Sequence, residues 1–166
     1  MFGLTPLGIF HTAISVIAVM TGIVCLAKQH AISMRTTAGQ IYAWTTVVTC
    51  LTGFGIFQHG GFGKPHVLGI VTLVTLAIAV LAERKRVFGA KSDYIEVVAY
   101  SATFLFHMIP AVTETFTRLP AGSPVFSSPD DPTLTHVTGL FFLIFLAGAG
   151  LQVAHLRSAR GQVLVR

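Results

Sequence analysis

The amino-acid sequence predicts an all-α integral membrane protein, a polytopic bundle of five transmembrane helices forming a single domain over residues 1–166. Composition is the first observation behind this prediction: 53% of the residues are hydrophobic and only 10% are charged. A soluble domain has about 25% charged residues. The second observation is that five separate segments approach or reach the roughly 20 apolar residues that one bilayer-spanning helix needs.

The five predicted spans follow one another with short polar connections. The first begins in an apolar N-terminal run without the basic region or cleavage site of a signal peptide, so we expect a permanent helix. The second ends before the glycine-rich QHGGFGKP, the third before the basic RKRVFGAKSD, and the fourth before the proline- and serine-rich LPAGSPVFSSPDDP. The predicted spans are Leu4–Ala27, Ala38–Phe57, His66–Ala82, Ile95–Phe116 and Leu134–His155.

Basic residues predict the orientation of this bundle. If the helices alternate in direction, nine of the eleven Lys and Arg residues fall on one side. Cytoplasmic loops are enriched in these residues, so the N-terminus is predicted outside and the C-terminus in the cytoplasm, with a bacterial cytoplasmic (inner) membrane as the location. The asymmetry accounts for the formal charge of +5 without a nucleic-acid partner. The expected partners are the lipid bilayer and, as open alternatives, another membrane protein or a second copy of the chain. The nine residues are Lys28, Arg35, Arg84, Lys85, Arg86, Lys91, Arg157, Arg160 and Arg166.

Histidines gather toward the predicted outer side. Five of the seven lie there, whereas His30 and His155 lie at the cytoplasmic ends of spans. His11 and His107 lie within predicted spans, where a polar side chain is energetically costly to bury. The five outer histidines are His11, His59, His66, His107 and His136.

The fourth span carries a polar stripe. Tyr100, His107 and Glu114 are spaced by seven residues, close to two helical turns, and Glu96 extends the stripe toward the cytoplasmic end. An ionised carboxylate in lipid costs about 2.5–3.5 kcal/mol or more, so this face should point into the bundle. Pro110 interrupts the helix between His107 and Glu114 and is expected to kink it.

The second span is rich in threonine. The hydroxyl groups could bond across helices, or to carbonyls of their own helix, which is the default expectation. The threonines are Thr45, Thr46, Thr49 and Thr52.

The favoured functional hypothesis is a cofactor site near the outer face. Imidazole is a ligand for haem iron and for Zn, Cu and Fe ions, and a carboxylate can complete such a site. Haem b would need two histidines on facing helices, and the chain would then serve electron transfer or redox chemistry. The candidate cofactor ligands are His11, His66, His107 and His136, and Glu114 joins them as a candidate metal ligand.

Other functions remain open from the residues alone. The chain could be a non-catalytic subunit of a larger membrane complex, or a small transporter with a proton or substrate path along Tyr100, His107 and Glu114. A structural interpretation is that Glu114 pairs with Arg118 at i+4, with His66 and His136 at the headgroup level. The sequence has no GxSxG, HExxH, GxGxxG or CxxCH motif, so no enzyme class is predicted.

The segment from Gly39 to Ala79 resembles the DUF2306 family of bacterial membrane proteins. The shared features are the Gly-x-x-Tyr opening, the glycine-rich loop and the Pro-His pair that starts the next helix, together with His11 in the first helix. Where that family has an arginine-histidine pair at the start of the fourth helix, this chain reads SDYIEVVAY. The resemblance implies a small multi-helix membrane protein and no particular activity. The architecture is also similar to small di-histidine cytochrome b modules.

Overall fold

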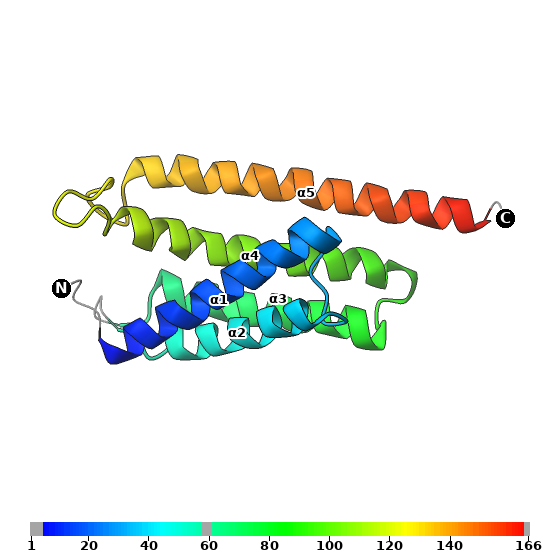
Figure 1. The fold of residues 1–166 in the computed structure, drawn as a ribbon, viewed down its shortest axis with the longest axis horizontal. Helices are drawn as coiled ribbons and strands as arrows, with labels where there is room; N and C mark the ends of the chain where they lie inside the picture. The colour runs from blue at the N-terminus through cyan, green and yellow to red at the C-terminus, as the bar shows by residue number, and fades with distance from the viewer. Residues whose placement is uncertain (1–4, 58–60, 165–166) are drawn as a thin grey trace.

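The protein is described by a computed structural model that covers residues 5–57 and 61–164, with the backbone alone for residues 160–164. These residues form five α-helices and one short 3₁₀-helix, and no β-strand occurs among them (Figure 1). The all-α prediction is therefore confirmed. The elements are α1 (Pro6–Gln29), α2 (Thr37–Gly53), α3 (Lys64–Lys85), η1 (Gly89–Lys91), α4 (Ser92–Phe116) and α5 (Pro132–Leu164).

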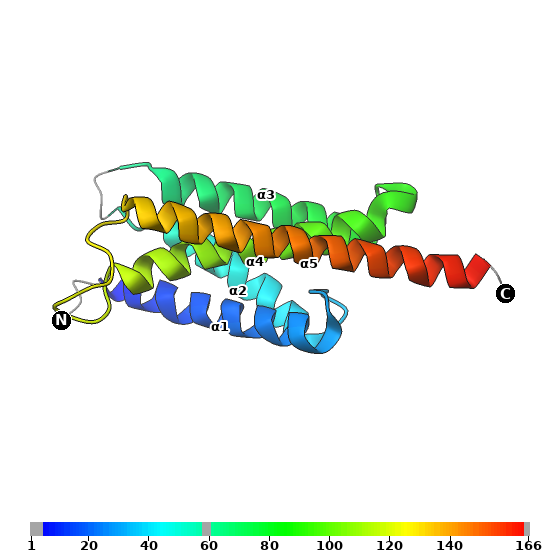
Figure 2. The ribbon, with the colours of Figure 1, turned by 90° about the horizontal axis from the view of Figure 1, so that it is seen from above.

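The helices run up and down along the long axis of the molecule, and α4 lies between α5 and the other three helices (Figures 1 and 2). In sequence order α1 packs on α2, α2 on α3, α3 on α4 and α4 on α5. This arrangement gives the bundle two ends. We call the end with the α1–α2 loop and η1 the basic end, because the described cations of the predicted cytoplasmic group lie there. The opposite end, where α1 begins and α4 leads into α5, is called the histidine end.

Four of the described helical segments are long and apolar enough to cross a membrane: α1, α3, α4 together with η1, and α5. The helix α2 is shorter than predicted. It has 17 residues, or roughly 26 Å, against a hydrocarbon core of about 30 Å. The prediction carried it to Phe57, but the chain leaves the helix at Gly53 through two tighter bonds, from the amides of Gly55 and Ile56 to the carbonyls of Thr52 and Gly53.

The other predicted spans overlap their helices with small shifts at the ends. The exception is α5, which has 33 residues, roughly 50 Å, and runs well beyond the predicted end at His155. Figure 1 shows its C-terminal part extending past the rest of the bundle. Gln152 fixes α5 to the bundle: its amide oxygen accepts from Ser101 at 2.9 Å and its amide nitrogen donates to the His30 carbonyl at 2.8 Å.

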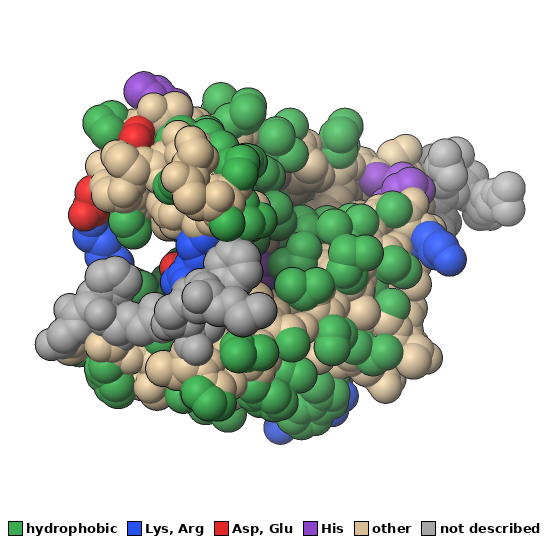
Figure 3. All heavy atoms as spheres, turned by 60° about the vertical axis from the view of Figure 1, so that its left-hand side comes forward, with side chains coloured by type: hydrophobic (Ala, Val, Ile, Leu, Met, Phe, Trp, Pro, Cys, Tyr) green, Lys and Arg blue, Asp and Glu red, His purple; other side chains and the backbone are tan. Residues whose placement is uncertain are grey.

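Small side chains allow the helices to pack closely. Ala18, Ala79 and Ala82 are fully buried, and a Cβ on Gly22 would lie 2.6 Å from the ring of Phe104. Large apolar side chains instead point outward, as with Leu143 at 62% exposure and Leu151 at 73%. Figure 3 shows hydrophobic side chains spread over much of the visible face. An apolar exterior around a core of small and polar residues is what a helix bundle in lipid requires.

Candidate functional site

The polar stripe on α4 faces the bundle interior over most of its length. Glu96, Tyr100, Thr103 and His107 follow one another at steps of four, three and four residues, and all four are buried. The stripe covers roughly 16 Å along the helix axis. The prediction of an inward-facing polar stripe is confirmed for Glu96, Tyr100 and His107, and Thr103 joins them as an unpredicted member. Glu114, at the histidine end of the same helix, is exposed.

His107 is held by the helix α2. Its Nε2 shares a hydrogen bond of 2.9 Å with the hydroxyl of Thr46, which is fully buried. The imidazole also meets the ring of Tyr42 edge to face, with 6.0 Å between the ring centroids. Two neighbouring turns of α2 therefore fix the position of the imidazole, which is only 6% exposed.

The hydroxyl groups continue from His107 toward the basic end. Tyr42 lies one turn before Thr46 on α2, and its hydroxyl shares a 2.8 Å hydrogen bond with the hydroxyl of Thr103. The Thr103 hydroxyl in turn lies 2.7 Å from the backbone carbonyl of Tyr100, to which it donates. Imidazole, threonine, tyrosine and threonine thus form one buried row between α2 and α4, in which two hydrogen-bonded pairs follow each other.

His11 approaches the same face of α2 one to two turns closer to the histidine end. Its Nδ1 lies 3.0 Å from the hydroxyl of Thr52. The Thr52 hydroxyl also lies 2.8 Å from the Val48 carbonyl of its own helix. The buried hydroxyl oxygen of Thr49 has no hydrogen-bond partner among the described residues.

Charge links His11 to its surroundings. It interacts electrostatically with His107 across the α1–α4 contact and with Glu114. Glu114 itself pairs with Arg118 one turn later, with 2.6 Å between Oε2 and Nε, as the structural interpretation of the sequence expected. Of the four candidate histidine ligands, His11 and His107 both bond to threonines of α2.

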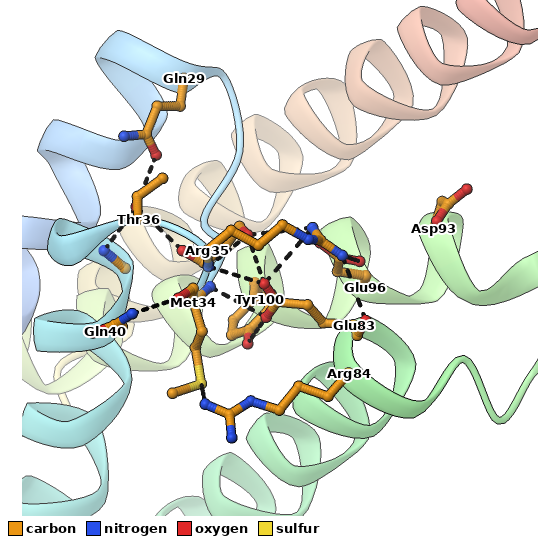
Figure 4. Close-up of polar contacts among 12 residues, drawn as sticks. Gln29, Met34, Arg35, Thr36, Gln40, Glu83, Arg84, Asp93, Glu96 and Tyr100 are labelled. Atoms are coloured by element: carbon orange, nitrogen blue, oxygen red, sulfur yellow. Dashed lines mark hydrogen bonds and ion pairs between the residues drawn. The ribbon is translucent and has the colours of Figure 1, made fainter.

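A second group of polar residues closes the basic end (Figure 4). The buried carboxylate of Glu83 accepts four hydrogen bonds from the donors of two other segments. Tyr100 in α4 donates from its hydroxyl at 2.6 Å, and the remaining donors belong to the α1–α2 loop. They are the Ser33 hydroxyl at 2.6 Å and the backbone amides of Met34 and Arg35, both at 3.1 Å.

Arg35 adds the only guanidinium that contacts both carboxylates of this group in the described part of the chain. It forms a two-pronged ion pair with Glu96, with 3.0 Å between Nη2 and Oε2, and its Nη1 lies 3.7 Å from Glu83. The hydrogen bond with Glu96 raises the pKa of Arg35 above its usual value, so the guanidinium stays charged. We call Ser33, Arg35, Glu83, Glu96 and Tyr100 the carboxylate cluster.

The other predicted ligands lie apart from this row. His66 stacks between Phe57 and Phe62, at centroid distances of 5.0 and 5.2 Å. Its Nδ1 accepts from the Gly63 amide at 3.2 Å, and its buried Nε2 has no partner in the region described. His136 is exposed on α5, and His59 lies outside the described residues. No three His, Cys, Asp or Glu residues among those described are grouped as metal ligands.

Sequence reasoning missed several members of the site. Glu83 directly follows the predicted end of the third span, and Arg35 was counted only as a loop cation. Thr46 bonds to another helix, against the default expectation, whereas Thr45 bonds to the Ile41 carbonyl of its own helix at 2.6 Å. The predicted stripe already contained Glu96 and Tyr100, and a second carboxylate at the end of the third span was a further signal that could have pointed to the carboxylate cluster.

Comparison with models of protein families found no match, and comparisons with curated proteins and with solved structures found none either.

Proposed function

We propose that this chain is a five-span membrane protein that conducts protons along the buried interface between α2 and α4, with the basic end in the cytoplasm. The supporting observation is a buried row of polar groups from His107 through Thr46 and Tyr42 to Thr103, in which His107 bonds to Thr46 and Tyr42 bonds to Thr103. This row points toward the Tyr100–Glu83 pair at the basic end. Ionisable groups inside a membrane protein commonly mark a proton path.

The groups in the row have the chemistry that a relay requires. A hydroxyl group can accept one proton while it donates another, and a neutral imidazole accepts on one nitrogen and donates from the other. His107 would receive protons from the His11 side, near the buried and unpartnered hydroxyl of Thr49. Glu83 would receive or release them at the basic end, where Arg35 and Glu96 lie beside it.

The polar row has no direct side-chain connection to the carboxylate cluster at Tyr100. The Thr103 hydroxyl donates to the backbone carbonyl of Tyr100, whereas the Tyr100 side chain bonds to Glu83. A proton crosses this step only if a water molecule or a rotation of the Thr103 hydroxyl connects the two. We therefore place the slow step of conduction here, between the row and the carboxylate cluster.

Proton flux into liposomes tests the proposal. Purified protein is reconstituted around a pH-sensitive dye, and a potassium gradient with valinomycin drives the flux. We expect Thr46→Val to remove most of the flux, since it keeps the side-chain shape but loses the bond to His107. Thr45→Val is the matched control, because the neighbouring hydroxyl bonds only to its own helix. Equal flux in folded Thr46→Val and Thr45→Val would rule out this path. So would a His107→Phe variant that conducts as well as the His155→Phe control.

A cofactor site is the second candidate, supported by a different observation. His11 and His107 come from different helices and both bond to threonines of α2, and Nε2 of His66 is buried without a partner in the described chain. Haem b or a Zn, Cu or Fe ion would bind through such imidazoles. An optical spectrum and elemental analysis of the freshly purified protein test this candidate. A Soret band or stoichiometric metal that is lost in His107→Phe would support it, and a colourless, metal-free folded protein would contradict it.

A further inference from the structure

A shallow groove lies between α2 and α3, near the basic end and away from the buried polar row. It encloses about 160 Å³. Its walls are aliphatic and aromatic except at one end, which is lined by the guanidinium group of Arg84. The lining residues are Met34, Ala43, Trp44, Val47, Leu76, Val80 and Arg84.

The helical spacing of these residues gives the groove a direction. Leu76, Val80 and Arg84 are four residues apart, so they lie along one face of α3 over roughly 12 Å. Trp44 and Val47 lie one turn apart on α2 and form the opposite wall. Trp44 is 64% exposed and therefore faces the surroundings of the bundle. An apolar channel thus runs along the surface from the middle of the bundle to the cation at the basic end.

Arg84 has no carboxylate partner among the described residues, although Glu83 precedes it in the chain. The Glu83 carboxylate is turned to the carboxylate cluster, where four donors occupy it. The guanidinium of Arg84 instead lies 3.9 Å from the Met34 sulfur, a weak acceptor (Figure 4). The two neighbouring arginines behave differently, since Arg35 pairs with Glu96 and Arg86 pairs with Asp93.

We propose that this groove binds an anionic phospholipid of the leaflet at the basic end, with the phosphate on Arg84 and part of one acyl chain along Trp44 and Val47. Charge complementarity identifies the headgroup: an exposed guanidinium without a carboxylate partner prefers an anion, and phosphate fits its fork of donors. The apolar walls identify the rest of the ligand. A soluble phosphate would leave these walls unused, whereas an acyl chain covers them. The site is separate from the proton path and does not depend on it.

Trp44 makes the site directly measurable, because it is the only tryptophan of the chain. Bromine atoms on a lipid acyl chain quench indole fluorescence on contact. The full-length protein is reconstituted with brominated phosphatidylglycerol or brominated phosphatidylcholine at increasing fractions, and quenching of Trp44 gives the relative affinity of the two lipids. Both lipids carry a phosphate, but the choline cation of phosphatidylcholine cancels its charge. We therefore expect phosphatidylglycerol to bind about fivefold more tightly, because one arginine near the surface attracts a lipid with a net negative charge.

Two variants and one control separate the two parts of the site. Arg84→Gln should bring the affinity ratio to about one, whereas Lys28→Gln, which removes one exposed positive charge from the same end, should leave the preference in place. Val47→Phe fills the groove and should weaken quenching by both lipids. Equal quenching by the two lipids in the unmodified protein would overturn the proposal. So would a preference that survives Arg84→Gln, or one that inorganic phosphate removes, since that result would assign Arg84 to a soluble anion.

Discussion

The hydroxyl of Tyr100 donates a 2.6 Å hydrogen bond to the carboxylate of Glu83, and this contact joins α4 to α3 inside the bundle. The same carboxylate accepts from Ser33 and from two backbone amides of the α1–α2 loop. The Glu83 side chain therefore connects three segments at the basic end: α3, α4 and the α1–α2 loop. Because all of its partners are donors, the carboxylate suits this position better than any neutral side chain of similar shape.

Replacing Glu83 by glutamine should destabilise the protein by at least about 2 kcal/mol. The amide nitrogen would face a donor, which leaves buried polar groups without a partner. Thermal melting in detergent, followed by circular dichroism, measures the loss. Asp93→Asn serves as the control because its ion pair with the half-exposed Arg86 is worth about 1 kcal/mol or less. If Glu83→Gln has the same melting temperature as Asp93→Asn, the stability of the loop does not depend on this carboxylate.

The row between α2 and α4 can be tested by removing one oxygen atom. Tyr42→Phe keeps the ring contact with His107 but loses the hydrogen bond to Thr103. We expect stability to fall by about 1 kcal/mol and proton flux to fall strongly, since the relay is broken. Thr103→Val breaks the same bond from the other side. The double variant should therefore conduct no less than either single one, and additive losses of flux would show that the two hydroxyls act separately.

Much of the fold could be predicted from the sequence because lipid imposes long apolar runs on a spanning helix. Each predicted span overlaps one observed helix, and the seven-residue spacing correctly placed Tyr100 and His107 on one buried face. The ends were less predictable. Hydropathy continues through Phe57 although the helix α2 stops at Gly53, where Gly53 and Gly55 favour tighter turns. Beyond His155 the polar continuation of α5 has no hydrophobic signal.

The candidate site was harder to predict because its contacts join distant parts of the chain. Glu83 bonds to residues about 50 positions earlier, and His107 bonds to a threonine 61 positions away. No local pattern encodes such pairs. Counting histidines on one side of the bundle gave their depth but not their direction around each helix. His66 and His136 therefore lie toward the same end of the bundle as His11 and His107 but apart from them.

Contact between α1 and α4 depends on the missing side chain of Gly22. A Cβ at this position would lie 2.6 Å from the Phe104 ring and 3.1 Å from that of Tyr42. Gly22→Val should therefore destabilise the bundle by about 1–3 kcal/mol, because the core cannot expand without straining side chains. Phe104→Leu in the same chain should restore part of the loss. Melting temperatures of the two single variants and the double variant test this. A double variant that is no more stable than Gly22→Val would show that the strain does not arise at Phe104.

The membrane orientation can be tested with a matched pair of single cysteines. Ser127 is exposed in the α4–α5 connection at the histidine end, and Ser158 is exposed on α5 at the basic end. The positive-inside rule predicts that Ser127→Cys faces outward and Ser158→Cys faces the cytoplasm. In intact cells a membrane-impermeant maleimide should label Ser127→Cys and should reach Ser158→Cys only after permeabilisation. The parent chain gives the background, which should be low because Cys25 and Cys50 are buried. The reverse pattern would invert the bundle and would move both the carboxylate cluster and the Arg84 groove to the outer leaflet.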